Sequence, residues 1–269
     1  MDSIETRSRV LFLAAGIAAM AIVCEARASD TVGSPVTWNA GSPNGNTTSA
    51  QGDVSEERLT CILKNAGTML GDLKKMSNDS NFDRTPVFSE QKAEEAGKAF
   101  AAAFAKLESN GVAQNLSHNC LMQLLSFSIE ESGLDGTNVQ KNESREKTGS
   151  GYIQITGGGN FTGISSCTGS AESIESVSAS ATSSALAAVC FFDQNYVKNK
   201  ANKDICDNSN DTSGQTKMLA LMNSGHVDGN CTDRASGKQM KCTEATEEVR
   251  RRLSTFQMVD QASVKCPTN

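Results

Sequence analysis

The sequence predicts a mainly helical fold that carries one small β-hairpin. Several stretches place apolar residues three and four positions apart, which is the spacing of a helix with one buried face. One short apolar stretch, residues 152–156, is flanked by glycines, as expected for a strand that leads into turns. The chain of 269 residues is long enough for one large domain or two small ones. The predicted helices cover residues 53–76, 89–107, 121–131, 184–199 and 244–259.

The first 52 residues are predicted to lie outside this domain. Two arginines precede an apolar run, residues 10–23, and a cleavage site of the A-x-A type follows it. The run is shorter than the ~18 to 20 residues that a membrane span needs. Residues 1–28 are therefore predicted to be a signal peptide that is removed, and not an anchor. Residues 29–52 are rich in Ser, Gly, Asn and Thr, which predicts a flexible segment before a folded domain over residues 53–269.

The cysteine content indicates an exported, disulfide-bonded protein. Cys24 would be lost with the signal peptide, which leaves eight cysteines and up to four disulfides. Eight cysteines allow about 105 pairings, so the connectivity stays open. No C-x-x-C pair occurs among them, so a metal site is not expected. Asn-x-Ser/Thr sequons, which are typical of secreted glycoproteins, begin at Asn46, Asn78, Asn115, Asn142, Asn160, Asn210 and Asn230.

Charge and motif content argue against several other functions. The net charge is −6 and the basic residues form no long block, so nucleic acid is not an expected partner. The chain has only two histidines, His118 and His226, which we assign to loops or the surface. A histidine-based triad is therefore not expected, and no phosphate-binding loop motif occurs. No organic cofactor is expected. We expect a monomer that has no membrane partner after signal cleavage.

The predicted helices are taken in order, starting with two that contain no candidate functional residue. In the first, residues 53–76, Asp53 and Glu56 have the spacing of a capping box. The second, residues 89–107, is rich in Ala and Phe, and we expect both to be core scaffold. Further along, residues 170–184 are predicted to be loop or weak helix. Residues 184–199 are predicted to form an apolar core helix. Residues 199–213 are predicted to form a polar loop.

The third predicted helix, residues 121–131, ends in the carboxylate pair Glu130 and Glu131. A glutamate at the end of a buried helix is partly desolvated, which raises its pKa and suits it to protonate a glycosidic oxygen. Taken alone, the pair is more simply explained as a solvated helix end, since most surface carboxylates have no catalytic role. The stretch that follows favours the catalytic interpretation.

Neutral hydrogen-bonding side chains lie just after this helix. A strand over residues 152–156 would place Gln154 and Thr156 on one face, and Asn160 follows the strand. Amides and hydroxyls of this kind can bind the hydroxyl and acetamide groups of sugars. The sequence therefore predicts a polysaccharide cleft between the helix end and the strand.

These residues also carry a resemblance to family 19 glycoside hydrolases, the chitinases of the lysozyme-like superfamily. Glu131-Ser132-Gly133-Leu134 resembles the family's His-Glu-Ser/Thr-Gly-Gly motif, and Gly149 to Thr156 with Asn160-Phe161 resembles its Gly-Arg-Gly-x-Ile-Gln-Leu-Thr/Ser…Asn-Tyr strand. Residues 217–225 are similar to its Ile-Asn-Gly-Gly segment, and the last helix to its Arg-Ile-x-x-Tyr. The resemblance implies a lysozyme-like α+β domain with the β-hairpin beside the cleft.

The resemblance also implies roles for single residues. Glu131 would be the acid in an inverting hydrolysis of β-1,4 N-acetylglucosamine polymers, with Glu130 as the alternative if the helix face is the guide. A second carboxylate, Glu143 or Glu146, would activate water from about 6.5 to 9.5 Å away. The remaining roles are sugar binding by Gln154, Asn160 and Asn223, water positioning by Thr156, and support by Arg252 and Tyr152.

Arg252 is expected to pair with a cleft carboxylate, whereas its neighbours Arg250 and Arg251 are expected to form a solvated basic face. Two alternatives to a secreted chitinase stay open. The short spacing from Glu131 to Gln154 is closer to goose-type lysozymes and lytic transglycosylases, which act on peptidoglycan with one essential glutamate. A glycan-binding protein that has kept the fold without catalysis is the other.

Overall fold

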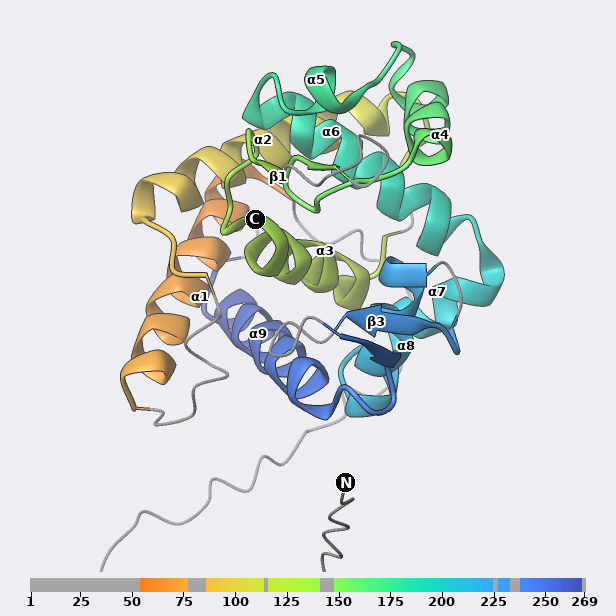
Figure 1. The fold of residues 1–269 in the computed structure, drawn as a ribbon. Helices are drawn as coiled ribbons and strands as arrows, with labels where there is room; N and C mark the ends of the chain where they lie inside the picture. The colour runs from red at the N-terminus through yellow and green to blue at the C-terminus, as the bar shows by residue number, and fades with distance from the viewer. Residues whose placement is uncertain are drawn as a thin grey trace, which may run out of the picture. The chain divides into compact units, whose positions relative to one another are not determined.

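The computed structural model describes residues 54–76, 86–113, 116–140, 148–224, 227–232 and 238–267. These residues form a mainly helical structure with two small two-stranded antiparallel sheets (Figure 1). The predicted signal peptide, residues 1–28, the predicted flexible segment, residues 29–52, and the predicted cap Asp53 all lie outside the described residues.

The first two helices are confirmed and pack against each other. Helix α1 spans Glu56–Met76 and α2 spans Glu90–Glu108. The N–H of Arg58 donates to the Ser55 hydroxyl at 3.3 Å, so Ser55 caps the first turn of α1. Gly97 of α2 lies against the backbone of Thr60, and its lack of a side chain lets the two helices approach closely.

Helix α3, His118–Ser132, is the central helix of the domain. It is capped by Ser117 and ends at Gly133, whose φ of 60° is the left-handed conformation that glycine favours. Every residue from Cys120 to Glu130 is buried, so the helix is surrounded by other elements rather than lying at the surface. In Figure 1 it lies in the middle of the view, and it packs on α9, α7 and α6.

The predicted strand over residues 152–156 is wrong. Strands β1, Val139–Gln140, and β2, Gly149–Ser150, pair in an antiparallel hairpin, and the chain then turns over residues 151–154 before Ile155 pairs back with Ser150. Gly151 has a φ of 75°, which allows this reversal. The apolar side chains of the turn are buried in the core instead of lining one face of a strand, and the Tyr152 ring lies 5.0 Å from that of Phe100.

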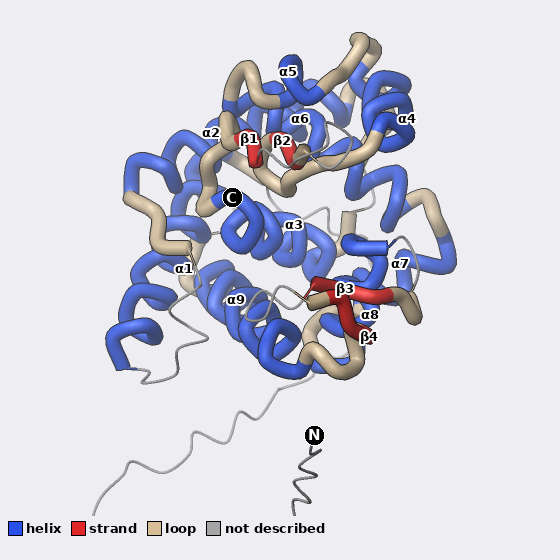
Figure 2. Tube along the Cα trace, in the orientation of Figure 1, coloured by secondary structure: helices blue, strands red, loops and turns tan. Residues whose placement is uncertain are grey.

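Helices fill most of the stretch that follows (Figure 2). The predicted helix over residues 184–199 is confirmed as α6, which continues into a π-helical turn, η3. The predicted loop over residues 199–213 is wrong, because it contains α7 and the first residues of α8. The glycines after the turn begin a helix, α4. The bounds are α4 Gly158–Thr168, α5 Ile174–Val177, α6 Ala181–Phe192, η3 Asp193–Val197, α7 Lys200–Asp207 and α8 Thr212–Ser224.

The last helix, α9, runs antiparallel to α3. It spans Thr246–Val264 and follows a second hairpin made of β3, Asn230–Thr232, and β4, Gln239–Lys241. At one end of the helix pair, His118 and Asp260 are in contact at 2.7 Å. At the other end, Arg252 contacts Glu131. These two contacts fix the relative direction of the helices.

Within the described residues, three disulfides cross-link the domain: Cys61–Cys266, Cys120–Cys206 and Cys167–Cys190. Cys231 and Cys242 are buried and are not disulfide-bonded. Such a content of disulfides is typical of an oxidising compartment. None of the helices in the described ranges combines the length and apolar character that crossing a bilayer requires.

Candidate active site

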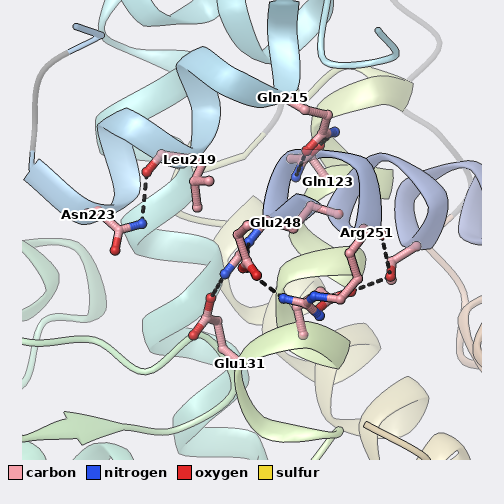
Figure 3. A network of polar contacts seen from close by, with 10 residues as sticks. Gln123, Glu131, Gln215, Leu219, Asn223, Glu248 and Arg251 are labelled. Carbon is pink, nitrogen blue, oxygen red and sulfur yellow. Dashed lines mark hydrogen bonds and ion pairs between the residues drawn. The ribbon is translucent and has the colours of Figure 1, made fainter. Parts of the chain in front are cut away.

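The candidate site is built where the end of α3 meets the first half of α9. Consecutive residues of a helix point about 100° apart, so Glu130 and Glu131 reach different partners on α9. Figure 3 shows Glu131 together with the network that it joins, in which dashed lines connect carboxylates to guanidinium groups. The two glutamates therefore have different environments although they are neighbours in the sequence.

Glu130 is enclosed. Its side chain is 1% exposed and contacts Arg251, whose side chain is 2% exposed. The hydroxyl of Thr255 also donates to a Glu130 carboxylate oxygen. Arg251 in turn donates to Glu248 at 2.7 Å. The expectation that Arg251 belongs to a solvated basic face is thus wrong, whereas Arg250 is exposed and lies 3.4 Å from Glu247.

Arg252 bridges two carboxylates. Its Nε donates to Glu248 at 2.8 Å, and its Nη2 donates to Glu131, so the predicted pairing of Arg252 with a carboxylate is present. The guanidinium carbon also lies 5.3 Å from the centre of the Phe127 ring. Burial alone would lower the pKa of Arg252, but attraction to Glu131 and Glu248 outweighs it and raises the pKa. Arg252 is therefore a permanent cation.

Glu131 is the member of the network that reaches solvent. Its side chain is 18% exposed, whereas the side chains of Glu130, Glu248, Arg251 and Arg252 are at most 5% exposed. One of its oxygens is held by Arg252. The arrangement fixes the direction of a carboxylate whose edge remains accessible, which is a geometry suited to proton transfer.

The sequence does not reveal four residues of this region: Glu248, Thr255, Gln123 and Gln215. Glu248 and Thr255 were assigned no role, although the spacing of Glu248 to Arg251 and Arg252, three and four residues, is that of side chains on one helix face. The buried amide pair between α3 and α8 was also missed. Here Gln215 donates to Gln123 at 2.6 Å and to the Ser209 carbonyl at 2.6 Å. No sequence pattern identifies such a neutral pair, because the two residues are far apart in the chain.

The residues predicted to bind sugar do not share one face of a strand. The Gln154 amide donates to the carbonyls of Gly151, at 2.8 Å, and Asn138, at 3.3 Å, so it ties the turn to the first hairpin. Asn160 is exposed in the first turn of α4 and donates to the Thr156 carbonyl at 2.6 Å. Thr156 is exposed.

Two other predicted residues, Tyr152 and Asn223, lie in the described ranges. Tyr152 is buried, and burial, with the nearby charges of Glu95 and Asp135, raises the pKa of its phenol. Asn223 lies in the last turn of α8, where its amide donates to the Leu219 carbonyl at 2.9 Å (Figure 3). The predicted base Glu143 and its alternative Glu146 lie outside the described residues.

An open cavity of about 610 Å³ lies elsewhere, between α1 and α2, and its lining does not include Glu131. In the described ranges, no group of three or more His, Cys, Asp or Glu side chains is arranged to hold a metal ion. Comparisons of the chain with protein-family models, curated proteins and solved structures find no match. The function is therefore inferred from the geometry of the α3–α9 network and from the motifs quoted above.

Proposed function

We propose that the protein is a secreted glycosidase that cleaves β-1,4-linked N-acetylglucosamine polymers, with Glu131 as the general acid. The observation that carries the proposal is the position of Glu131 at the end of a buried helix, partly exposed and oriented by Arg252. Of the two neighbouring glutamates, Glu130 is enclosed and has no access to a substrate. This difference favours Glu131 as the acid.

The charges of the network support a role in proton transfer. The contacts join three carboxylates, of Glu130, Glu131 and Glu248, to two guanidinium groups. If all five groups are ionised, they carry an excess of one negative charge in a region of low solvent access, which is unfavourable. Of the three carboxylates, Glu131 has the most exposed side chain, so it is the group through which a proton would reach solvent or a glycosidic oxygen.

The base that an inverting mechanism needs is not among the network carboxylates. Glu130 and Glu248 are both enclosed, so neither can activate a water molecule on the far side of a sugar. Glu143 is the candidate base, with Glu146 as the alternative. A mechanism with one essential glutamate needs no such group, so the same geometry also favours a muramidase or lytic transglycosylase acting on peptidoglycan.

The test is the substitution Glu131→Gln, assayed on chitin oligosaccharides and on peptidoglycan. Glutamine can still accept the hydrogen bond from Arg252 but cannot donate a proton as a carboxylic acid does. We expect turnover to fall by at least ~10²-fold, with an unchanged circular dichroism spectrum. The polymer that the unmodified protein cleaves then distinguishes chitinase from peptidoglycan chemistry.

Glu247→Gln is the matched control. Glu247 is exposed on α9 and contacts the exposed Arg250, so its substitution should leave turnover unchanged. Full turnover by the Glu131→Gln protein would reject Glu131 as the acid. Binding to either polymer without turnover by the unmodified protein would instead select the non-catalytic glycan-binding alternative.

A further inference from the structure

The second hairpin places two cysteines on one face. Cys231 in β3 lies opposite Met240 in β4, and the Cys242 N–H donates across the hairpin to the Gly229 carbonyl at 3.4 Å. Side chains alternate between the two faces along a strand, and directly opposed residues share a face. Cys231, Met240 and Cys242 therefore point to the same side, with the two thiols as diagonal neighbours.

That face is closed by the domain. The two cysteines pack with Leu219 and Ala220 of α8 and with Ala245 and Val249 at the start of α9, and their exposed fractions are 0% and 2%. The two thiols are joined by a hydrogen bond. Burial, with a smaller contribution from this bond, raises the pKa of Cys242 to about 12 against the opposing charge of Arg252. A buried, protonated thiol is a poor target for external reagents, so each thiol's available partner is the other.

We propose that Cys231 and Cys242 form a fourth disulfide that closes the β3–β4 hairpin. The other six cysteines in the described ranges are already paired, and these two are in hydrogen-bond contact on one face of a hairpin. The oxidant is a small-molecule disulfide of the exporting compartment. Its sulfur–sulfur bond is exchanged in two steps for the Cys231–Cys242 bond, and the two protein thiol protons pass to the two small-molecule thiols released.

The link has a structural consequence for the domain. A two-stranded hairpin is only marginally stable by itself, and here it is attached to α8 and α9 through a small apolar cluster. A disulfide across it restricts the unfolded hairpin and holds the cluster residues together. Exchange requires a thiolate, so we expect this disulfide to form while the hairpin is still open and the thiols are exposed to solvent.

Peptide mapping of the full chain, secreted from a eukaryotic host, tests the proposal directly. The protein is unfolded in an alkylating reagent without reductant and then digested with trypsin. Arg234, Lys238 and Lys241 lie between the two cysteines, so tryptic cleavage places Cys231 and Cys242 on different peptides. We expect these two peptides to be joined by a reducible bond. Recovery of both as alkylated, separate peptides would overturn the proposal.

The stability of three variants gives an independent readout. Cys231→Ala, Cys242→Ala and the double substitution each remove the same bond, so we expect all three to lower the Tm by a similar amount, roughly 5 °C. If the two thiols formed no disulfide, each single substitution would lower the Tm slightly, and the two decreases would add in the double variant. Additive losses would therefore contradict the fourth disulfide.

Discussion

At the scale of single residues, the site depends on the different environments of two adjacent glutamates, Glu130 and Glu131. Both lie in the last turn of α3; the serine that follows favours Glu131 as the acid, and the helix face favours Glu130. The rotation of the helix directs Glu130 into an enclosed contact with Arg251 and Thr255, and it directs Glu131 to Arg252 at the edge of the core. Exposure, and not residue type, separates the two.

Substitution Arg251→Met should strongly destabilise the protein. It removes the cation that contacts both Glu130 and Glu248, and leaves these enclosed carboxylates without that partner. Breaking a buried ion pair from one side typically costs about 3 to 5 kcal/mol. The free energy of unfolding from denaturant titration measures the loss.

Arg250→Met on the same helix is the control. Arg250 is exposed, so its replacement should change the unfolding free energy by no more than about 0.5 kcal/mol. Equal losses in the two variants would show that the buried network contributes no more than a surface pair.

At the scale of elements, the contact between α1 and α2 depends on a glycine. A Cβ atom at Gly97 would lie 2.2 Å from the Thr60 hydroxyl oxygen and 2.7 Å from the Thr60 backbone. At Gly71, which is also helical, a Cβ atom would have no neighbour within 4 Å. The two glycines therefore differ in what an added methyl group would meet.

Gly97→Ala and Gly71→Ala should consequently have opposite effects on stability. Alanine is favoured over glycine in a helix by about 1 kcal/mol, and Gly71→Ala should raise stability by up to that amount. For Gly97→Ala, overpacking against the backbone costs typically about 1 to 3 kcal/mol, so we expect a net loss. Thermal melts of the two variants measure the difference, and a stabilised Gly97→Ala protein would contradict the close packing.

The elements also show how far sequence reasoning extends. Helices α1 and α3 are predicted by apolar residues at helical spacing, and α2 and α6 by stretches rich in apolar residues; the sequence also predicts α9. Helix α7 was missed because its sequence is mostly polar; it is held by tertiary contacts, the Cys120–Cys206 disulfide and the bond from Asn119 to the Asp207 carbonyl. The turn over residues 151–154 resembles a strand in sequence, because buried turn residues and strand residues are equally apolar.

The same limit applies to the candidate site. The sequence predicts that Arg252 pairs with a carboxylate, and Arg252 donates to Glu131, 121 residues away in the chain. The sequence did not identify Glu248 and Thr255, because a buried carboxylate or hydroxyl is recognised only by the residues that surround it. Gln154 and Asn160 were assigned to sugar binding from a strand that is absent, and both instead hydrogen-bond to nearby carbonyls.

At the scale of the whole molecule, the core contains both tyrosines of the chain, Tyr152 and Tyr196. Burial raises the pKa of each phenol above its ordinary value of 10.0. In the unfolded chain the phenols ionise near that ordinary value. The folded state therefore holds more protons above pH 10, and stability that is fully present below this pH falls as the pH rises.

We expect alkaline unfolding that is coupled to tyrosine ionisation. Each tyrosine should reduce the free energy of unfolding by about 1.4 kcal/mol per pH unit above pH 10. Tyrosinate absorbance should stay low until the helical circular dichroism signal is lost, and both should then change in one step. The urea-unfolded protein is the reference and should ionise near pH 10. Gradual ionisation of the folded protein near pH 10 would contradict the burial of these residues.

The disulfide between Cys61 and Cys266 joins the first helix to the residues that follow the last one. All the loops of the described domain lie between these two cysteines. A protease that cuts any one of them leaves both fragments attached in a single covalent molecule. A nicked form would therefore remain one molecule, heavier only by the water added at the cut. Helix α1 would stay tethered beside α9, so the cut ends could pack again instead of diffusing apart.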